Sequence, residues 1–196
     1  SIDGKIKGSF LIANVYRSGI KSMLEKLVAS FQMYLLSGDS EREKATLVNL
    51  FGSDKGLHFR QTPEAKLEFV SKIQEKGAHV LMVGDGLNDA GALRASEVGV
   101  AVTDDISAFS PASDAILAGE NLHLLAPFIN MSKATMSVII ASFTISVIYN
   151  IVGVSFAVSG LLSPLVSAIL MPLSSISVVV FTTVSTTLRA RLMNLA

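Results

Sequence analysis

The sequence predicts an α/β domain built on a parallel sheet, followed by a hairpin of two transmembrane helices. Two observations carry this prediction. Short apolar runs alternate with helical patterns between residues 9 and 102, which is typical of a parallel α/β sheet. Residues 134–188 then contain no Asp, Glu, Lys, Arg or His, and only 16% of the whole chain is charged, against about 25% in typical soluble proteins.

The soluble elements follow from apolar spacing and from start and stop signals. We expect strands where short apolar runs lie between polar segments, at 9–15, 32–36, 57–59, 79–83 and 98–102. We expect helices where apolar residues recur at helical intervals, at 18–30, 39–51, 63–76 and 88–96. The third helix has Pro63 in its first turn and Gly77 after its end. Ligands bind beyond the carboxyl ends of parallel strands, so residues that follow strands are candidate site residues.

The uncharged stretch is too long for one membrane crossing. At about 1.5 Å per residue, a single helix over 134–188 would be roughly 80 Å long, whereas a hydrocarbon core is about 30 Å thick. Gly160 and Pro164 divide the stretch into two spans, expected at about 135–158 and 163–186. The alternative is the core of a soluble helical protein, but the helices of such a core still need charged outer faces.

Charges at the ends of the hairpin predict its orientation. Lys133 precedes the first span, Arg189 and Arg191 follow the second, and the connecting turn carries no charge. The positive-inside rule therefore places residues 1–133 and the C-terminus in the cytoplasm. The expected organisation is a soluble domain over 1–121, a linker helix over 122–134, two membrane helices over 135–188, and a cytoplasmic tail over 189–196.

Composition limits the remaining possibilities. The formal net charge is zero, so nothing indicates a nucleic-acid partner. The chain has no cysteine, which excludes disulfides and thiolate metal sites. It begins with Ser1 rather than methionine and lacks a signal-peptide pattern. We therefore expect it to be a piece of a longer protein.

The strongest candidate site is the motif GDGLND at residues 84–89, directly after an apolar strand. Asp85 and Asp89 would repel each other there, by about 4 kcal/mol at 4 Å and an effective dielectric constant of 20. A hard cation such as Mg²⁺ removes this repulsion, since it takes one or two carboxylates together with waters and phosphate oxygens. Gly84 and Gly86 permit a tight turn close to a ligand. The alternative is an ordinary acidic turn.

A second candidate is the segment LLSGDSERE at residues 35–43. Ser37 and Gly38 end a strand and precede a helix, and Asp39 follows them. A hydroxyl and free backbone N–H groups at a helix start suit a phosphate oxygen. The alternative is a normal N-cap, which uses the same residue types.

The third candidate is Lys66, in the pattern PxxK at the start of the helix expected over 63–76. A lysine in the first turn is unfavourable against the helix dipole. It is easier to explain if its ammonium group reaches a phosphoryl group or the acidic motif. The alternative is a solvated surface lysine.

The motifs SGD, PxxK and GDGLND, in this order and followed by a membrane hairpin, resemble the C-terminal part of a P-type ATPase. Similar motifs recur in the haloacid-dehalogenase-like phosphotransferase superfamily, whose domains have a Rossmann-like parallel sheet. The resemblance implies a role for each motif residue: Asp85 and Asp89 for Mg²⁺, with Gly84, Gly86 and Asn88 in the binding loop; Ser37, Gly38 and Asp39 for phosphoryl oxygens; and Lys66 for an aspartyl phosphate.

The chain departs from the family pattern at several positions. The family usually has Thr in place of Ser37, Pro in place of Gly91 and Asp in place of Asn14. The phosphorylated aspartate, in an Asp-Lys-Thr-Gly motif, has no counterpart in this sequence. The resemblance therefore implies that the acceptor aspartate lies upstream, beyond a nucleotide-binding domain, and that this segment alone does not turn over ATP.

The hairpin contains a second group of candidate residues. Tyr149 and Asn150 lie in the first span, and Met171 and Ser175 lie four residues apart in the second, on one helix face. No carboxylate is present for a hard cation, whereas a thioether with hydroxyl and amide neighbours suits a soft ion such as Cu⁺. The pattern is similar to that of copper exporters in the heavy-metal branch of P-type ATPases. The alternative is that Met171 and the serines serve only helix packing.

The implied function is ATP-driven export of a heavy-metal cation, with Cu⁺ as the expected ion, through an aspartyl-phosphate intermediate. The implied cofactor is Mg²⁺, and the implied partners are the lipid bilayer of a bacterial plasma membrane, ATP bound by the missing nucleotide domain, and a metallochaperone that delivers the ion. One rival is a membrane-anchored phosphatase of the same superfamily, for which the hairpin is only an anchor. Another is a scaffold or regulator without catalysis.

Overall fold

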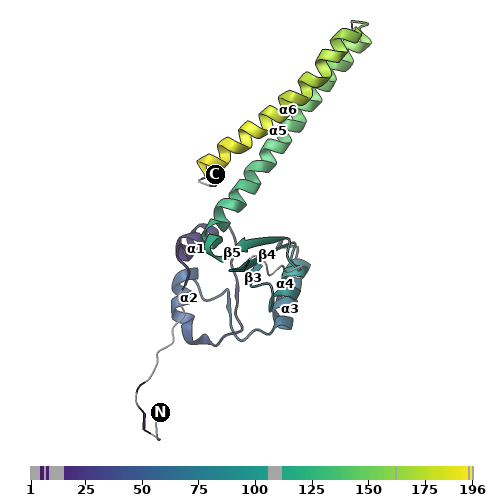
Figure 1. Ribbon diagram of the computed structural model, residues 1–196. Coiled ribbons are helices and arrows are strands. Elements are labelled where there is room, and N and C mark those ends of the chain that lie inside the picture. The colour runs from purple at the N-terminus through teal and green to yellow at the C-terminus, as the bar shows by residue number, and fades with distance from the viewer. Residues whose placement is uncertain are drawn as a thin grey trace. The chain divides into compact units, whose positions relative to one another are not determined.

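The computed structural model describes residues 5, 6, 8, 16–105, 112–161, 163–193 and 195. It divides into two compact units at His123 and Leu124, and each unit is described by itself (Figure 1). The strand expected over 9–15, with Asn14, lies outside the described residues.

The first unit alternates helices and parallel strands. Its elements in chain order are α1 (Ile20–Val28), β1 (Leu35–Leu36), the 3-10 helix η1 (Glu41–Glu43), α2 (Lys44–Phe51), β2 (Leu57–His58), α3 (Pro63–Glu75), β3 (Leu81–Gly84), α4 (Ala90–Ala95), β4 (Val98–Thr103), β5 (Ala115–Ala118) and the 3-10 helix η2 (Gly119–Leu124). Strand β1 pairs with β2, and β4 pairs with β3 on one side and β5 on the other, all in parallel. The predicted parallel α/β architecture is confirmed; strand β5 was not predicted.

The strand pairings show where each candidate motif begins relative to its sheet. Gly84, the last residue of β3, is paired with Ala101 of β4, and Leu36, the last residue of β1, is paired with His58 of β2. Asp85 and Ser37 follow directly after β3 and β1. Both candidate motifs therefore begin at the carboxyl end of a parallel strand, where α/β proteins place their ligands.

Apolar side chains on both sides of the strands form the core. Helix α3 packs against α4, and α1 packs against α2; Figure 1 shows the two pairs on opposite sides of strands β3 to β5. The buried apolar residues come from all these layers: Met23, Leu24 and Leu27 of α1, Val70 of α3, Ala92 and Leu93 of α4, and Val100 and Ala101 of β4. Burial of these side chains is the main stabilising contribution of such a layered arrangement.

Helix α3 has strong local start and stop signals. The Thr62 side chain accepts a hydrogen bond from the backbone N–H of Ala65 at 3.2 Å, and Pro63 occupies the first helical position. At the other end Gly77 has a φ of 84°, which suits glycine. These signals fix the start of α3 and hence the position of Lys66 in its first turn.

The second unit consists of two long apolar helices, α5 (Leu125–Val158) and α6 (Pro164–Leu192), which pack side by side in an antiparallel hairpin (Figure 1). Both are long and apolar enough to cross a membrane, and almost none of the most apolar stretch of either is buried. Such exposure does not fit the core of a soluble protein, in which these side chains would be covered. The Arg189 guanidinium of α6 donates a hydrogen bond to the backbone carbonyl of Ala134 in α5 at 3.0 Å.

The turn between the helices uses the two residues that punctuate the sequence. Gly160 has a φ of 70° just after α5, and Pro164 is the first residue of α6. Ser163 caps α6 by accepting a hydrogen bond from the backbone N–H of Val166 at 3.3 Å. Helix α6 continues through Pro172 in its interior.

Candidate functional site

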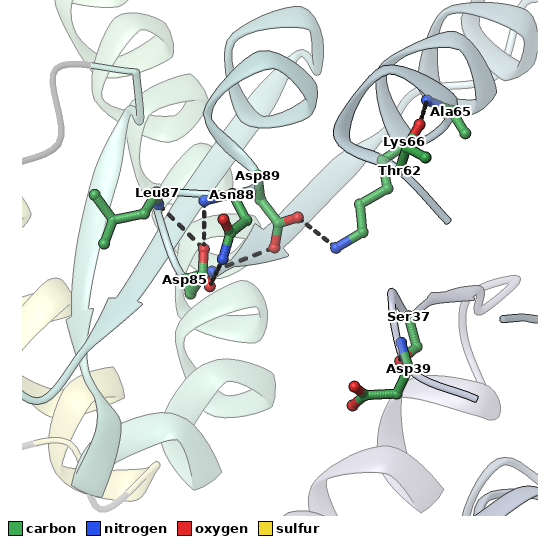
Figure 2. Close-up of polar contacts among 9 residues, drawn as sticks. All are labelled: Ser37, Asp39, Thr62, Ala65, Lys66, Asp85, Leu87, Asn88 and Asp89. Atoms are coloured by element: carbon green, nitrogen blue, oxygen red, sulfur yellow. Dashed lines mark hydrogen bonds and ion pairs between the residues drawn. The ribbon is translucent and has the colours of Figure 1, made fainter. Parts of the chain in front are cut away.

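The loop after β3 is shaped by the Asp85 carboxylate. Its Oδ1 atom accepts hydrogen bonds from the backbone N–H groups of Leu87 and Asn88, both at 3.1 Å, and its Oδ2 atom accepts one from the Asn88 side chain, also at 3.1 Å (Figure 2). Gly86 has a φ of 81°, which favours glycine at this turn. The loop therefore holds the Asp85 carboxylate in a fixed orientation beside the strand end.

Asp89 joins the acidic loop to helix α3. The Lys66 ammonium group lies 2.6 Å from Asp89 Oδ1, and only 11% and 12% of the two side chains are exposed. The other carboxylate oxygen of Asp89 accepts a longer hydrogen bond, 3.4 Å, from the backbone N–H of Asp85. Figure 2 shows Lys66 extending from α3 toward this carboxylate. Asp85, Asp89 and Lys66 thus form one cluster. The positive charge of the Lys66 ammonium group offsets the repulsion between the two carboxylates.

Gly84 makes room for this cluster. A Cβ atom at position 84 would lie 2.7 Å from the Cβ atom and 2.9 Å from the Cγ atom of Asp89. Side chains do not approach so closely, so any larger residue would displace the carboxylate of Asp89. The glycine before Asp85 is therefore required by close packing against Asp89.

Ser37 and Asp39 lie on a separate segment from Lys66 and Asp89 (Figure 2). The Ser37 hydroxyl accepts a hydrogen bond from the backbone N–H of Asp39 at 3.1 Å, which shapes the loop after β1. A Cβ atom at Gly38 would lie 3.5 Å from the backbone oxygen of Gln61, an ordinary contact. Within the described residues, no hydrogen bond joins Ser37 or Asp39 to the Lys66–Asp89 pair. The structure thus brings Lys66, Asp85 and Asp89 into contact and leaves Ser37 on a neighbouring loop.

An open depression of about 270 Å³ lies beside Ser37. Its lining includes the polar residues Asp39, Arg42 and Glu43. The Tyr16 hydroxyl donates a hydrogen bond to the Glu43 carboxylate. Burial and this carboxylate together raise the pKa of Tyr16 to about 12, because both disfavour the phenolate.

The donor set of the acidic loop fits Mg²⁺. Mg²⁺ binds through one or two carboxylates and completes its shell with waters and phosphate oxygens. Asp85 and Asp89 supply two carboxylates at one strand end, and Gly84 and Gly86 place no side chain beside them. Among the described residues, no group of three or more His, Cys, Asp and Glu side chains is placed so that it could hold a metal ion. The cluster therefore suits a cation that shares its ligands with a substrate better than one enclosed by protein.

The second group of predicted residues lies between α5 and α6. Tyr149 and Asn150 of α5 and Met171 and Ser174 of α6 line one depression of about 320 Å³, together with Gly153, Val154, Ala157, Ser167 and Leu170. A Cβ atom at Gly153 would meet nothing within 4 Å. The depression is therefore open at that glycine.

The two adjacent serines of α6 differ in position. Ser174 lines the depression and is half-buried, whereas Ser175 is exposed and its hydroxyl donates to the Met171 carbonyl at 3.4 Å. Ser175 and Met171 lie one turn apart, as their spacing predicts. Successive helical residues are rotated by about 100°, so the two serines point in different directions from α6.

Sequence reasoning missed Ser177. Its Oγ atom lies 3.3 Å from the Tyr149 hydroxyl, so it contacts one of the predicted residues across the hairpin. The available signal was its position three residues after Ser174, which places the two on one face of α6. Serines are common at helix interfaces in membranes, so this spacing alone was not specific.

Comparisons with known proteins agree with these features. Residues 2–97 match the family of haloacid dehalogenase-like hydrolases. The chain is 32% identical to a copper-exporting P-type ATPase of Staphylococcus epidermidis over 91% of its length, and 33% identical to a chloroplastic copper-transporting ATPase of Arabidopsis thaliana over 87%. It is 29% identical to the cation-transporting P-type ATPase B of Mycobacterium bovis over 97%. The chain spans only 22%, 19% and 25% of these three relatives.

Solved structures share the fold. The catalytic CPx-ATPase domain CopB-B is 33% identical, with a TM-score of 0.53, and the match covers 62% of this chain and 49% of that one. A zinc-transporting PIB-type ATPase has a TM-score of 0.74 at 24% identity, and the match covers 86% of this chain and 28% of that one. The second likeness bears on the fold alone.

Fold, motifs and relatives together define the class as a haloacid-dehalogenase-like α/β domain joined to long apolar helices, as in membrane ATPases. Within that class the chain belongs to the heavy-metal branch of the P-type ATPases, and it corresponds to the C-terminal phosphorylation region with the two helices that follow it.

Proposed function

We propose that this chain is the C-terminal part of an ATP-driven transporter that exports a heavy-metal cation, with Cu⁺ as the ion. The observation that supports the proposal most strongly is the common depression of Tyr149, Asn150 and Met171 between two apolar helices. An amide, a phenol and a thioether without a carboxylate suit a soft monovalent ion better than a hard divalent one. The copper transporters among the relatives agree with this choice.

The soluble unit would carry out phosphoryl transfer to an aspartate that lies upstream of this segment. Lys66 would stabilise the negative charge of the phosphorylated aspartate, and the hydroxyl of Ser37 with the backbone at Gly38 and Asp39 would orient its oxygens. Both contributions are positional and electrostatic, which is how proteins accelerate phosphoryl transfer. The buried contact between Lys66 and Asp89 supports the first role, because it holds the ammonium group beside the acidic loop.

Mg²⁺, held by Asp85 and Asp89, would neutralise charge on the phosphate when bound. The residues around it have separate tasks. Asn88 fixes the Asp85 carboxylate through its side-chain amide, Gly84 makes room for the Asp89 carboxylate, and Gly86 permits the turn between them. This segment would therefore supply part of a catalytic centre, and ATP would reach it through a nucleotide-binding domain elsewhere in the protein.

The setting we propose is a bacterial plasma membrane, with residues 1–133 and the C-terminus in the cytoplasm. Lys133 and Arg189 at one end of the hairpin, and the uncharged turn at the other, support this orientation. The proposed organisation is a phosphorylation domain over 1–121, a linker over 122–134 and two membrane helices over 135–188. A metallochaperone is the proposed source of Cu⁺.

The test uses the full-length protein from which this segment comes. Asp85→Asn should abolish phosphoenzyme formation from ATP. Met171→Ala should weaken metal-stimulated ATPase activity and leave phosphorylation by inorganic phosphate intact, since that reaction needs only the soluble site. Normal phosphoenzyme formation in Asp85→Asn would overturn the proposed catalytic role, and loss of both activities in Met171→Ala would indicate misfolding.

A membrane-anchored phosphatase is the second candidate, and the match of residues 2–97 to a hydrolase family favours it. It predicts hydrolysis of a small phosphate ester at a rate that does not depend on the metal ion. It also predicts that Met171→Ala has no effect on that rate, because the hairpin would be an anchor only.

A further inference from the structure

Tyr149 of α5 and Ser177 of α6 are joined by a side-chain contact across the hairpin, with 3.3 Å between the two hydroxyl oxygens. The Ser177 hydroxyl also donates a hydrogen bond to the backbone carbonyl of Leu173, one turn earlier in α6, at 2.7 Å. A serine hydroxyl has a single proton and two acceptor positions. Because that proton is directed at Leu173, Ser177 accepts from Tyr149, and the phenol is the donor.

With its proton directed at Ser177, the Tyr149 phenol can act toward other groups only as a hydrogen-bond acceptor. The Tyr149 proton is directed at Ser177, which is not among the described residues that line the depression. Tyr149 lines the depression, so toward a ligand there its phenol oxygen has only lone pairs to offer. Asn150, Met171 and Ser174 line the same depression. Their side chains carry an amide oxygen, a thioether sulfur and a hydroxyl oxygen, all of which can act as acceptors.

We propose that Ser177 is a positioning residue of the ion site: by accepting the phenolic proton it keeps Tyr149 as an acceptor toward a cation in the depression. The inference rests on the proposed transport function and adds a residue to its ion site. The proton path runs from Tyr149 to Ser177 and from Ser177 to the Leu173 carbonyl, and no group in it changes its protonation state. A phenol held in this way favours a cation and disfavours an anion, which would need a donor.

The experiment measures the Cu⁺ concentration that half-saturates the ATPase activity of the full-length transporter. Ser177→Ala removes the acceptor, so the phenolic proton is free to turn toward the ion. We expect the half-saturating concentration to rise about 2- to 10-fold, the range for the loss of one hydrogen bond, with little change in the maximal rate. Ser177→Thr keeps the hydroxyl and should restore the wild-type value.

Two further variants separate positioning from a general packing effect. In a Tyr149→Phe background, Ser177→Ala should cause no additional rise in the half-saturating Cu⁺ concentration, because no phenolic proton remains to be oriented. Ser155→Ala is the matched control, since the Ser155 hydroxyl donates to the Ile151 carbonyl at the same 2.7 Å and Ser155 does not line the depression. It should leave the half-saturating concentration unchanged.

Phosphorylation by inorganic phosphate checks the folding of each variant. If Ser177→Ala fails that check, Ser177→Cys, a close steric match and a weaker hydrogen-bonding group, replaces it with the same expected direction. An unchanged half-saturating concentration in these variants, or a rise that persists in the Tyr149→Phe background, overturns the role of Ser177. An unchanged value in Met171→Ala instead overturns the proposed ion site itself, so the two failures are distinguishable.

Discussion

The Lys66 ammonium group lies 2.6 Å from the Asp89 carboxylate, and both side chains are almost fully covered. A buried ion pair of this kind stabilises the folded protein little more than two well-packed apolar residues would. Removal of one partner, however, leaves a buried charge without compensation. The contact therefore makes the stability of the soluble unit depend on both residues together.

Lys66→Met should lower the free energy of unfolding by about 3 kcal/mol, and Asp89→Asn by a similar amount. In the double variant, the free energy of unfolding should fall by clearly less than the sum of the two single effects, because neither buried charge of the pair remains. Denaturant unfolding of the purified protein in Mg²⁺-free buffer measures all three. Simple additivity would show that the two side chains do not interact in solution.

Gly84 and Gly91 provide a matched comparison of one substitution in two surroundings. Gly84→Ala places a Cβ atom 2.7 Å from the Cβ of Asp89 and should destabilise the protein by about 1–3 kcal/mol, the usual range for overpacking. Gly91→Ala adds a methyl group 3.8 Å from Leu67, an ordinary contact inside helix α4. It should be neutral or stabilise by up to about 1 kcal/mol. Thermal unfolding of both variants tests the contrast, and equal effects would contradict it.

Tyr16 should make stability fall at high pH. Its pKa is raised to about 12 in the folded protein, from an ordinary value of 10.0, by burial and by the Glu43 carboxylate. A group whose folded pKa is raised contributes its stability fully below the unfolded pKa and loses it as pH rises through the folded pKa. The contribution should thus disappear between pH 10 and about 12. The measured quantity is the difference in the free energy of unfolding between the wild type and Tyr16→Phe, which should shrink across that window.

The parallel α/β architecture could be predicted from the sequence because short apolar runs and capped helices alternate regularly. Helix α3 illustrates this, since Thr62, Pro63 and Gly77 each act through local backbone geometry. Strand β5 (Ala115–Ala118) could not be predicted in this way. It has four residues and is placed by pairing with β4, where Val100 is opposite Ala115. Such pairing is a long-range property that local spacing does not contain.

The candidate site was predictable in part for the same reason. Lys66 was conspicuous because a lysine opposes the helix dipole in a first turn, and it contacts Asp89 of the acidic motif. Spacing could not predict which of Ser174 and Ser175 lines the depression, because this depends on how α6 is rotated against α5. The partner of Tyr149 depends on the same rotation. Neither follows from spacing within one helix.

Gly153 is a position at which the free volume of the depression between α5 and α6 can be changed by substitution. It lines the depression, and a Cβ atom there would meet nothing within 4 Å. Gly153→Ala should therefore fold normally, because the added methyl group enters open space. Gly153→Leu should fill much of the same space and hinder a ligand beside Tyr149 and Met171.

We expect Gly153→Leu to reduce metal-stimulated ATPase activity of the full-length protein by about an order of magnitude, the effect of losing roughly 1.4 kcal/mol of binding or transition-state stabilisation. Gly153→Ala should have a smaller effect. Thr144→Leu, which adds a similar side chain at an exposed position of α5, serves as the control and should retain activity. Phosphorylation by inorganic phosphate should be preserved in all three variants. Full metal-stimulated activity in Gly153→Leu would show that no ion occupies this depression during transport.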